Sequence, residues 1–216
     1  MRLDRLLTLL TISVLGSVAV AVLSPALLPT VEPKMMADPA FDAAAFYESR
    51  LPARASRDSG RATLPGQPAE KLPPKPVAGL NQVQTNNAYI VVEVGRQLNL
   101  PRRALVVALS TAMQETYLRN LANPVVPASL KYPNDGKASD ADSIGVFQQR
   151  PSMGWGTVAQ LMDPAQSAAR FYARLVKIKN WQGLSVAGAA QAVQRSAFPS
   201  AYAKHVTQAE RIVDAF

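Results

Sequence analysis

Hydrophobic and polar residues follow different patterns in three successive regions of the chain. Behind Arg2 and Arg5, residues 6–28 form an uncharged and almost continuously apolar run of 23 residues. As a helix this run would be about 34 Å long, enough to cross the roughly 30 Å hydrocarbon core of a bilayer. An Ala-x-Ala pattern at residues 19–21 would instead allow cleavage. Residues 1–31 are therefore predicted to form a signal-anchor helix or a cleaved signal peptide.

Residues 32–80 show no hydrophobic period apart from a short stretch at 41–47 that could form an amphipathic turn or two, and they hold eight of the chain's 17 prolines. Their seven basic and six acidic residues nearly cancel, and the KLPPKP stretch at 71–76 favours an extended polyproline conformation. We expect a Pro-rich disordered linker here. Because basic residues at the start of an anchor stay in the cytoplasm, the linker would hold the rest of the chain on the outer side of the cytoplasmic membrane.

Residues 81–216 carry apolar residues at helical spacing and are numerous enough for one hydrophobic core. Each predicted helix begins after a capping residue or at a proline: 88–98 after Asn87, 101–117 from Pro101, 164–178 after Asp163, 186–196 after Ser185 and 201–215 after Ser200. Between 120 and 157 the helical period is lost, and a short β-like run occurs at 144–147. We therefore expect a mostly α domain with a small loop or hairpin lobe.

Composition narrows the chemistry available to this domain. The chain has no cysteine and only one histidine, so thiolate sites and histidine-rich zinc sites are excluded. The histidine, His205, is expected to be half exposed on the last helix. No metal and no cofactor is expected. Residues 81–216 hold 14 basic and 8 acidic residues and so carry +6 of the net charge of +8. This charge suits an anionic cell wall, and without a nucleic-acid motif we expect no nucleic-acid partner.

Glu115 is the candidate catalytic residue. It lies near the end of the predicted helix 101–117, whose Ala104–Leu109 stretch is apolar nearly all round and should be buried. Burial and the negative end of the helix dipole both disfavour a charged carboxylate, so both would raise its pKa. A general acid that works near neutral pH requires a raised pKa. The alternative is an exposed glutamate that is solvated or paired with Arg119.

Four motifs, the first of which contains the candidate acid, follow one another along the chain: MQET at 113–116, SIGVFQQ at 143–149, AQAVQRSA at 190–197, and Tyr202. This order resembles the soluble lytic transglycosylases and goose-type lysozymes, and in particular exported lysozyme-like domains of Gram-positive bacteria. The resemblance covers about residues 88–213. It implies a lysozyme-like α+β fold and peptidoglycan glycan strands as the substrate. With the N-terminal segment, it implies an extracytoplasmic protein, anchored to the membrane or secreted to the wall.

The resemblance also assigns roles by position. Glu115 would be the catalytic acid/base, and Tyr202 would orient its carboxylate or the sugar. The other candidate substrate-binding residues are Thr116, Ser143, Gly145, Gln148, Gln149, Trp155 and Gln194. Two alternatives stay open. Gln149 would otherwise be a core-edge amide satisfied by the backbone, and Trp155 would be an anchor of its loop rather than a platform for a sugar ring.

Because few carboxylates are available near Glu115 in the sequence, three interpretations of the function stay open. In the resembled transglycosylases one Glu protonates the oxygen of the MurNAc–GlcNAc β-1,4 bond and then deprotonates the muramyl C6 hydroxyl, which leaves a 1,6-anhydro end. A lysozyme-type hydrolase would need a second carboxylate to position water, and Asp140 and Asp142 are the candidates. Arg150 stands where goose-type lysozymes have an Asp, which favours the transglycosylase. The family's Ala-Tyr-Asn-Ala-Gly stretch is replaced around 191–194, which favours a non-catalytic peptidoglycan-binding scaffold in an envelope-spanning machine.

Overall fold

The computed structural model describes residues 42, 44–45, 49, 74–196 and 199–216. The predicted signal segment 1–31 and most of the predicted linker lie outside the described residues. The helices are α3 (Gln82–Gln97), α4 (Arg102–Thr116), α5 (Val158–Leu161), α6 (Pro164–Leu175), α7 (Val186–Gln194) and α8 (Val206–Ala215), with 3-10 helices at Pro127–Lys131, Pro151–Met153, Trp181–Gly183 and Pro199–His205. The described part of the chain is mostly helical, as predicted, and none of its helices is both long and apolar enough to span a membrane.

α3 begins earlier than predicted. Asn81 caps it, because the Asn81 side chain accepts a hydrogen bond from the Gln84 backbone and the Gln84 side chain accepts one from the Asn81 backbone. Asn87, the predicted cap, lies inside the helix, where its buried amide donates to a carboxylate oxygen of Asp135. The prediction of Asn87 as the cap is wrong because the reciprocal Asn81–Gln84 pair satisfies two backbone donors at once, whereas Asn87 serves a tertiary contact.

The starts of the later helices follow the sequence more closely. Asp163 caps α6 and Ser185 caps α7 by accepting hydrogen bonds from backbone N–H groups two or three residues later, which confirms both predictions. Pro101 was predicted as the first helical residue, but its extended backbone makes it the N-cap, and α4 begins one residue later at Arg102. The last predicted helix is interrupted, however, since Ser200 lies in a 3-10 helix and α8 begins only at Val206. Ser200 is therefore not a cap, and the interruption gives the segment around Tyr202 its own direction.

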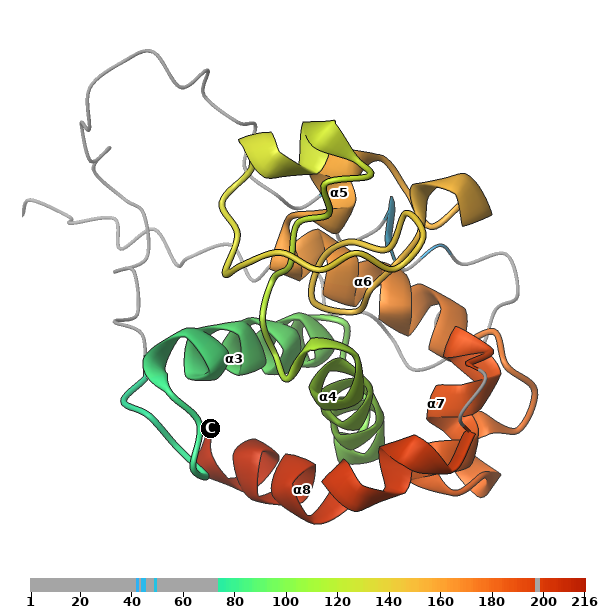
Figure 1. The fold of residues 1–216 in the computed structure, drawn as a ribbon. Helices are drawn as coiled ribbons and strands as arrows, with labels where there is room; N and C mark the ends of the chain where they lie inside the picture. The colour runs from blue at the N-terminus through green and yellow to red at the C-terminus, as the bar shows by residue number, and fades with distance from the viewer. Residues whose placement is uncertain (1–41, 43, 46–48, 50–73, 197–198) are drawn as a thin grey trace, which may run out of the picture.

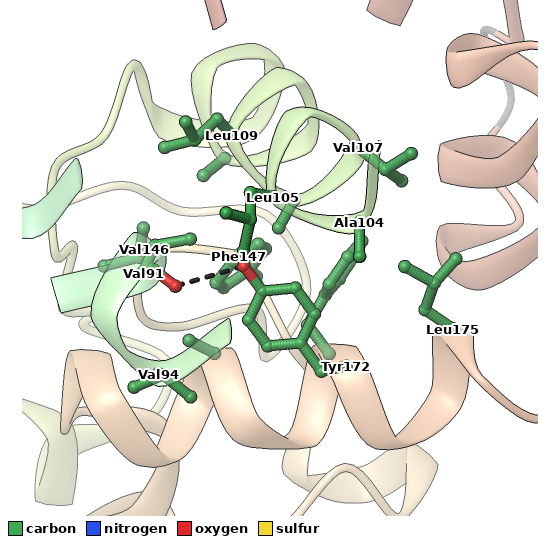
Figure 2. Close-up of a cluster of buried hydrophobic side chains, with 14 of the residues drawn as sticks. Val91, Val94, Ala104, Leu105, Val107, Leu109, Val146, Phe147, Tyr172 and Leu175 are labelled. Atoms are coloured by element: carbon green, nitrogen blue, oxygen red, sulfur yellow. Dashed lines mark hydrogen bonds between the residues drawn. The ribbon is translucent and has the colours of Figure 1, made fainter. Parts of the chain in front are cut away.

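α4 is the central helix of the fold. It lies between α3, α7 and α8 in Figure 1 and also contacts α6. Every residue of α4 from 104 to 113 is buried, which explains why its sequence is apolar nearly all round. Leu105 and Leu109 of α4 belong to the same buried cluster as Phe147 and Tyr172 (Figure 2). The C-terminal end of α4 is therefore held firmly at the place where Glu115 emerges from the core.

Residues 118–157 form the predicted lobe. No hairpin strand forms in this described segment, and isolated β-bridges tie its turns together instead. Gly145 has a φ of +80°, and a Cβ at this position would lie 2.2 Å from the carbonyl oxygen of Leu161. Thr116, the last residue of α4, donates its hydroxyl to the Val146 carbonyl at 2.8 Å. These contacts pack the lobe against the helices and bring the 143–149 motif to the end of α4.

Candidate active site

The carboxyl group of Glu115 meets two side chains that come from distant parts of the chain. Its Oε1 atom accepts a hydrogen bond from the Tyr202 hydroxyl at 3.0 Å and another from Gln194 Nε2 at 3.2 Å. The same nitrogen of Gln194 donates to the Phe147 carbonyl at 2.9 Å. Gln194 is the last residue of α7 and Tyr202 lies in the 3-10 helix before α8. Helix ends and the lobe therefore position Glu115 together.

The pKa of Glu115 is raised above its ordinary value. Burial is the main cause because it disfavours the charged form, and the hydrogen bonds from Gln194 and Tyr202 oppose it in part. The negative charge of Asp140 adds to the increase. The expectation that burial raises the pKa of this carboxyl is confirmed. The pKa of Tyr202 is raised as well, by burial and then by the neighbouring Glu115 charge, so the phenol remains a donor.

A cleft of about 900 Å³ opens beside Glu115. It lies between the end of α4, the lobe, the C-terminal end of α6 and the end of α7. The candidate site residues that line it are Glu115, Asp140, Ser143, Gln148, Trp155 and Gln194. The candidate residues outside its lining are Thr116, Asp142, Gly145, Gln149 and Tyr202. Tyr202 nevertheless acts on the cleft through its hydrogen bond to Glu115.

Gln149 lies beneath the cleft and is only 1% exposed. Its Nε2 atom donates to the Ser167 carbonyl at 3.1 Å, and its Oε1 atom accepts the Ser167 hydroxyl at 2.9 Å. Gln149 is thus the buried amide of the alternative interpretation, and a sugar does not reach it. Its neighbour Gln148, held by a hydrogen bond from its Nε2 to the Gly145 carbonyl, lines the cleft. The motif therefore presents one glutamine to the cleft and uses the other to hold the lobe on α6.

The two candidate second carboxylates differ in position. Asp142 accepts hydrogen bonds from Arg150 at 2.5 Å and from the Ser152 backbone at 2.8 Å. Burial acts to raise the pKa of Asp142, but these bonds outweigh it and lower the pKa to about 2. Asp142 thus closes the turn that follows the 143–149 motif. Asp140 is exposed and lines the cleft with Glu115, so it is the candidate that can reach a bound water.

Trp155 lies at the cleft but has little free surface. The Arg174 guanidinium lies over its ring at 3.5 Å from the centroid, and the indole side chain is almost fully buried. Arg174 also donates to the carbonyls of Met153 and Gly154. This arrangement agrees with the loop-anchor interpretation of Trp155, because the ring packs in the domain and fixes a cation at the cleft instead of offering an open face.

Several residues of this region were not predicted from the sequence. His205 is 8% exposed rather than half exposed, and its Nε2 atom lies 3.1 Å from Gln114 Oε1, next to Glu115. Arg174, Lys177 and Arg195 line the cleft from the ends of α6 and α7. Basic residues in the last turns of helices are common because of the helix dipole, so their convergence has no signal in the sequence.

Neither a protein-family model nor a curated protein sequence matches this chain. The fold and the site define a class on their own: a mostly helical protein with an open polar cleft and a partly buried carboxyl of raised pKa. Within the described residues, no group of three or more His, Asp or Glu side chains is arranged to hold a metal ion.

Proposed function

We propose that this protein cleaves the glycan strands of peptidoglycan at the MurNAc–GlcNAc β-1,4 bond as a lytic transglycosylase. Glu115 is the single acid/base of the reaction. The observation that carries the proposal is the partly buried Glu115 carboxyl, which has a raised pKa and is held by Tyr202 and Gln194 at an open cleft. The order of the MQET, SIGVFQQ and Tyr202 motifs supports the same family and a lysozyme-like fold.

The two hydrogen bonds on Glu115 define where its proton lies. Both donors reach Oε1, so Oε1 acts as the acceptor oxygen and the proton is carried by Oε2. In the first step Oε2 gives this proton to the glycosidic oxygen as the bond from that oxygen to muramyl C1 breaks. In the second step the carboxylate takes the proton of the muramyl C6 hydroxyl as O6 bonds to C1. The Glu115 proton is restored, no water is consumed, and the product is a 1,6-anhydro end.

Asp140 supports a second candidate function, lysozyme-type hydrolysis. Asp140 lines the cleft that holds Glu115, and its charge raises the pKa of that residue. In this reaction Glu115 would again protonate the leaving oxygen, and Asp140 would position and deprotonate the water that attacks C1. The products would then carry ordinary reducing ends. Asp142 is the weaker candidate because Arg150 and Ser152 engage its carboxylate.

The proposed setting is the outer side of the cytoplasmic membrane. The apolar run at 6–28 supports an anchor or an export signal, and the Pro-rich region 32–80 supports a linker of sufficient length to let the domain reach the wall. The basic character of residues 81–216 suits an anionic wall. The partners proposed are therefore the glycan strands and the membrane itself.

The test is a digest of purified peptidoglycan by the full-length protein, read by mass spectrometry. We expect wild type to release anhydro-muropeptides and Glu115→Gln to lose at least about 100-fold in rate, the usual contribution of a general acid. Glu210→Gln, an exposed change of the same type on α8, is the matched control. Ordinary reducing ends that disappear in Asp140→Asn would favour hydrolysis. Undiminished activity of Glu115→Gln would overturn both mechanisms, and binding without any product would favour a scaffold.

A further inference from the structure

Basic side chains outnumber acidic ones in the lining of the cleft. The residues that line the cleft include Arg150, Arg174, Lys177 and Arg195 but only two acidic residues, Glu115 and Asp140. Arg150 is neutralised by its ion pair with Asp142. In the part of the chain that the structure describes, no ion pair joins the other three cations to a carboxylate. The cleft that holds Glu115 therefore keeps three cations without a carboxylate partner in the described residues.

These three cations come from the C-terminal ends of two helices, α6 and α7. Arg174 lies in the last turn of α6, Lys177 follows it by three residues, and Arg195 is the C-cap residue that follows α7. A cation near one helix end is favoured by the dipole of that helix and needs no ligand. The helix dipole does not explain why two helix ends direct cations into the same cleft, because the like charges repel each other there. The charge of Arg195 acts on Arg174, whose pKa is lowered first by burial and then by this neighbour.

Two structural details set Arg174 and Arg195 apart from ordinary surface cations. Arg174 is fixed over the Trp155 ring at 3.5 Å and by hydrogen bonds to the carbonyls of Met153 and Gly154. Arg195 has a left-handed backbone with φ of 54°, a helix-end conformation that favours glycine. An arginine at this position therefore presents a charge to the cleft against the preference of the backbone.

We infer that Arg174, Lys177 and Arg195 form a subsite for an oxyanion carried by the glycan strand, a carboxylate of a stem peptide or a phosphate of an attached wall polymer. Guanidinium groups pair with either oxyanion through parallel N–H donors, and the ammonium of Lys177 adds a point charge. The subsite selects charged strands over neutral ones and aligns the strand along the cleft toward Glu115. This inference rests on the proposed function for the identity of the strand.

The test measures binding, so that it does not depend on turnover. Full-length Glu115→Gln protein in detergent is titrated with four glycans: neutral chitohexaose, strands with stem peptides, strands whose peptides an amidase has removed, and strands that keep their phosphodiester polymer. The informative variant adds Lys177→Gln and Arg195→Gly, because glycine suits the left-handed position and protects the fold. The matched control adds Lys131→Gln and Arg211→Gln, two exposed cations outside the cleft lining.

We expect the cleft variant to bind charged strands about tenfold more weakly at low salt, with little change for chitohexaose and a smaller effect at high salt. The control should bind as tightly as its parent, the Glu115→Gln protein without further substitutions. The charged strand that loses most affinity identifies the oxyanion. Equal affinity of parent and cleft variant for every charged strand would overturn the subsite even if wild type still cleaves peptidoglycan. A parent that binds the strands while wild type releases no product would overturn the proposed cleavage alone, and a parent that binds no strand would overturn both.

Discussion

Glu115 is a carboxyl group that the fold holds partly out of water while leaving it open to a cleft. Tyr202 and Gln194 both donate to Oε1, and these bonds lower the cost of ionisation without cancelling the effect of burial. The protonated and ionised forms of Glu115 are therefore closer in free energy near neutral pH than those of an exposed glutamate, which favours a group that acts first as an acid and then as a base. A raised pKa in the native state also has a consequence for stability.

Stability should depend on pH through Glu115. Below about pH 4 the carboxyl is protonated in both folded and unfolded chains and makes no difference. As the pH rises toward the raised pKa, the unfolded state ionises first, so the free energy of unfolding falls. Glu115→Gln does not titrate, so its stability relative to wild type should increase as the pH rises from about 4 to the raised pKa. Urea unfolding across this range, with Glu210→Gln as the control, measures the gain, and a constant difference would contradict the raised pKa.

Single residues also show where sequence reasoning stops. Burial of the α4 end and the raised pKa of Glu115 could be predicted, because both follow from an apolar helix. Gln148 and Gln149 are chemically identical neighbours, yet one lines the cleft and the other bonds to Ser167 in the core. Only the backbone direction in the lobe, where Gln148 has a left-handed φ of 47°, separates their roles.

Helices and turns position the site through their ends. Asp163 and Ser185 could be recognised as caps because capping acts over two or three residues. The start of α3 was equally local, because Asn81 and Gln84 form a capping box over three residues, and it was missed in favour of Asn87. The interruption before α8 depends instead on tertiary packing around Tyr202. The turn at Gly145 also positions the site, because it determines how closely the lobe approaches the end of α5.

Two glycines of the lobe allow a matched comparison. Gly145→Ala adds a methyl group 2.2 Å from the Leu161 carbonyl oxygen at a φ of +80°, whereas Gly154→Ala meets nothing within 4 Å at a φ of +68°. We expect Gly154→Ala to cost about 1 kcal/mol of unfolding free energy, for its backbone conformation alone. Gly145→Ala should cost about 2–4 kcal/mol, because the steric collision is added. Equal losses in denaturant titrations would show that the close approach does not matter.

The whole domain is organised around α4, which packs against α3, α6, α7, α8 and the 3-10 helix Pro199–His205 and carries the catalytic candidate in its last turn. The lobe has no strand of its own in the described residues and relies on α4, α5 and α6 for its position. Damage to the buried face of α4 should therefore loosen the cleft as well as the core. A single cooperative unfolding transition is the expected behaviour of such a unit.

Leu109→Ala tests this organisation. Leu109 is fully buried in α4, and its truncation should cost about 2–5 kcal/mol through lost contacts and a cavity. Val125→Ala, at a position 66% exposed in the lobe, should change stability by no more than about 0.5 kcal/mol. Circular dichroism reports the helices, and the fluorescence of the largely buried Trp155, which lines the cleft, and Trp181 reports tertiary packing. Transitions that separate in Leu109→Ala would show that the lobe unfolds independently.

Local sequence patterns were sufficient for a mostly helical domain, several helix starts, a central apolar helix and an acid at its end, because these features depend on residues within one or two turns of each other. The surroundings of that acid depend on the tertiary structure. Gln194 and Tyr202 lie 79 and 87 residues from Glu115 along the chain, and the cleft cations come from separate helix ends. Their meeting results from the packing of helices and lobe around α4, which spacing along the chain does not record. Only the contact between Tyr202 and Glu115 was expected, and that expectation came from the resemblance rather than from spacing.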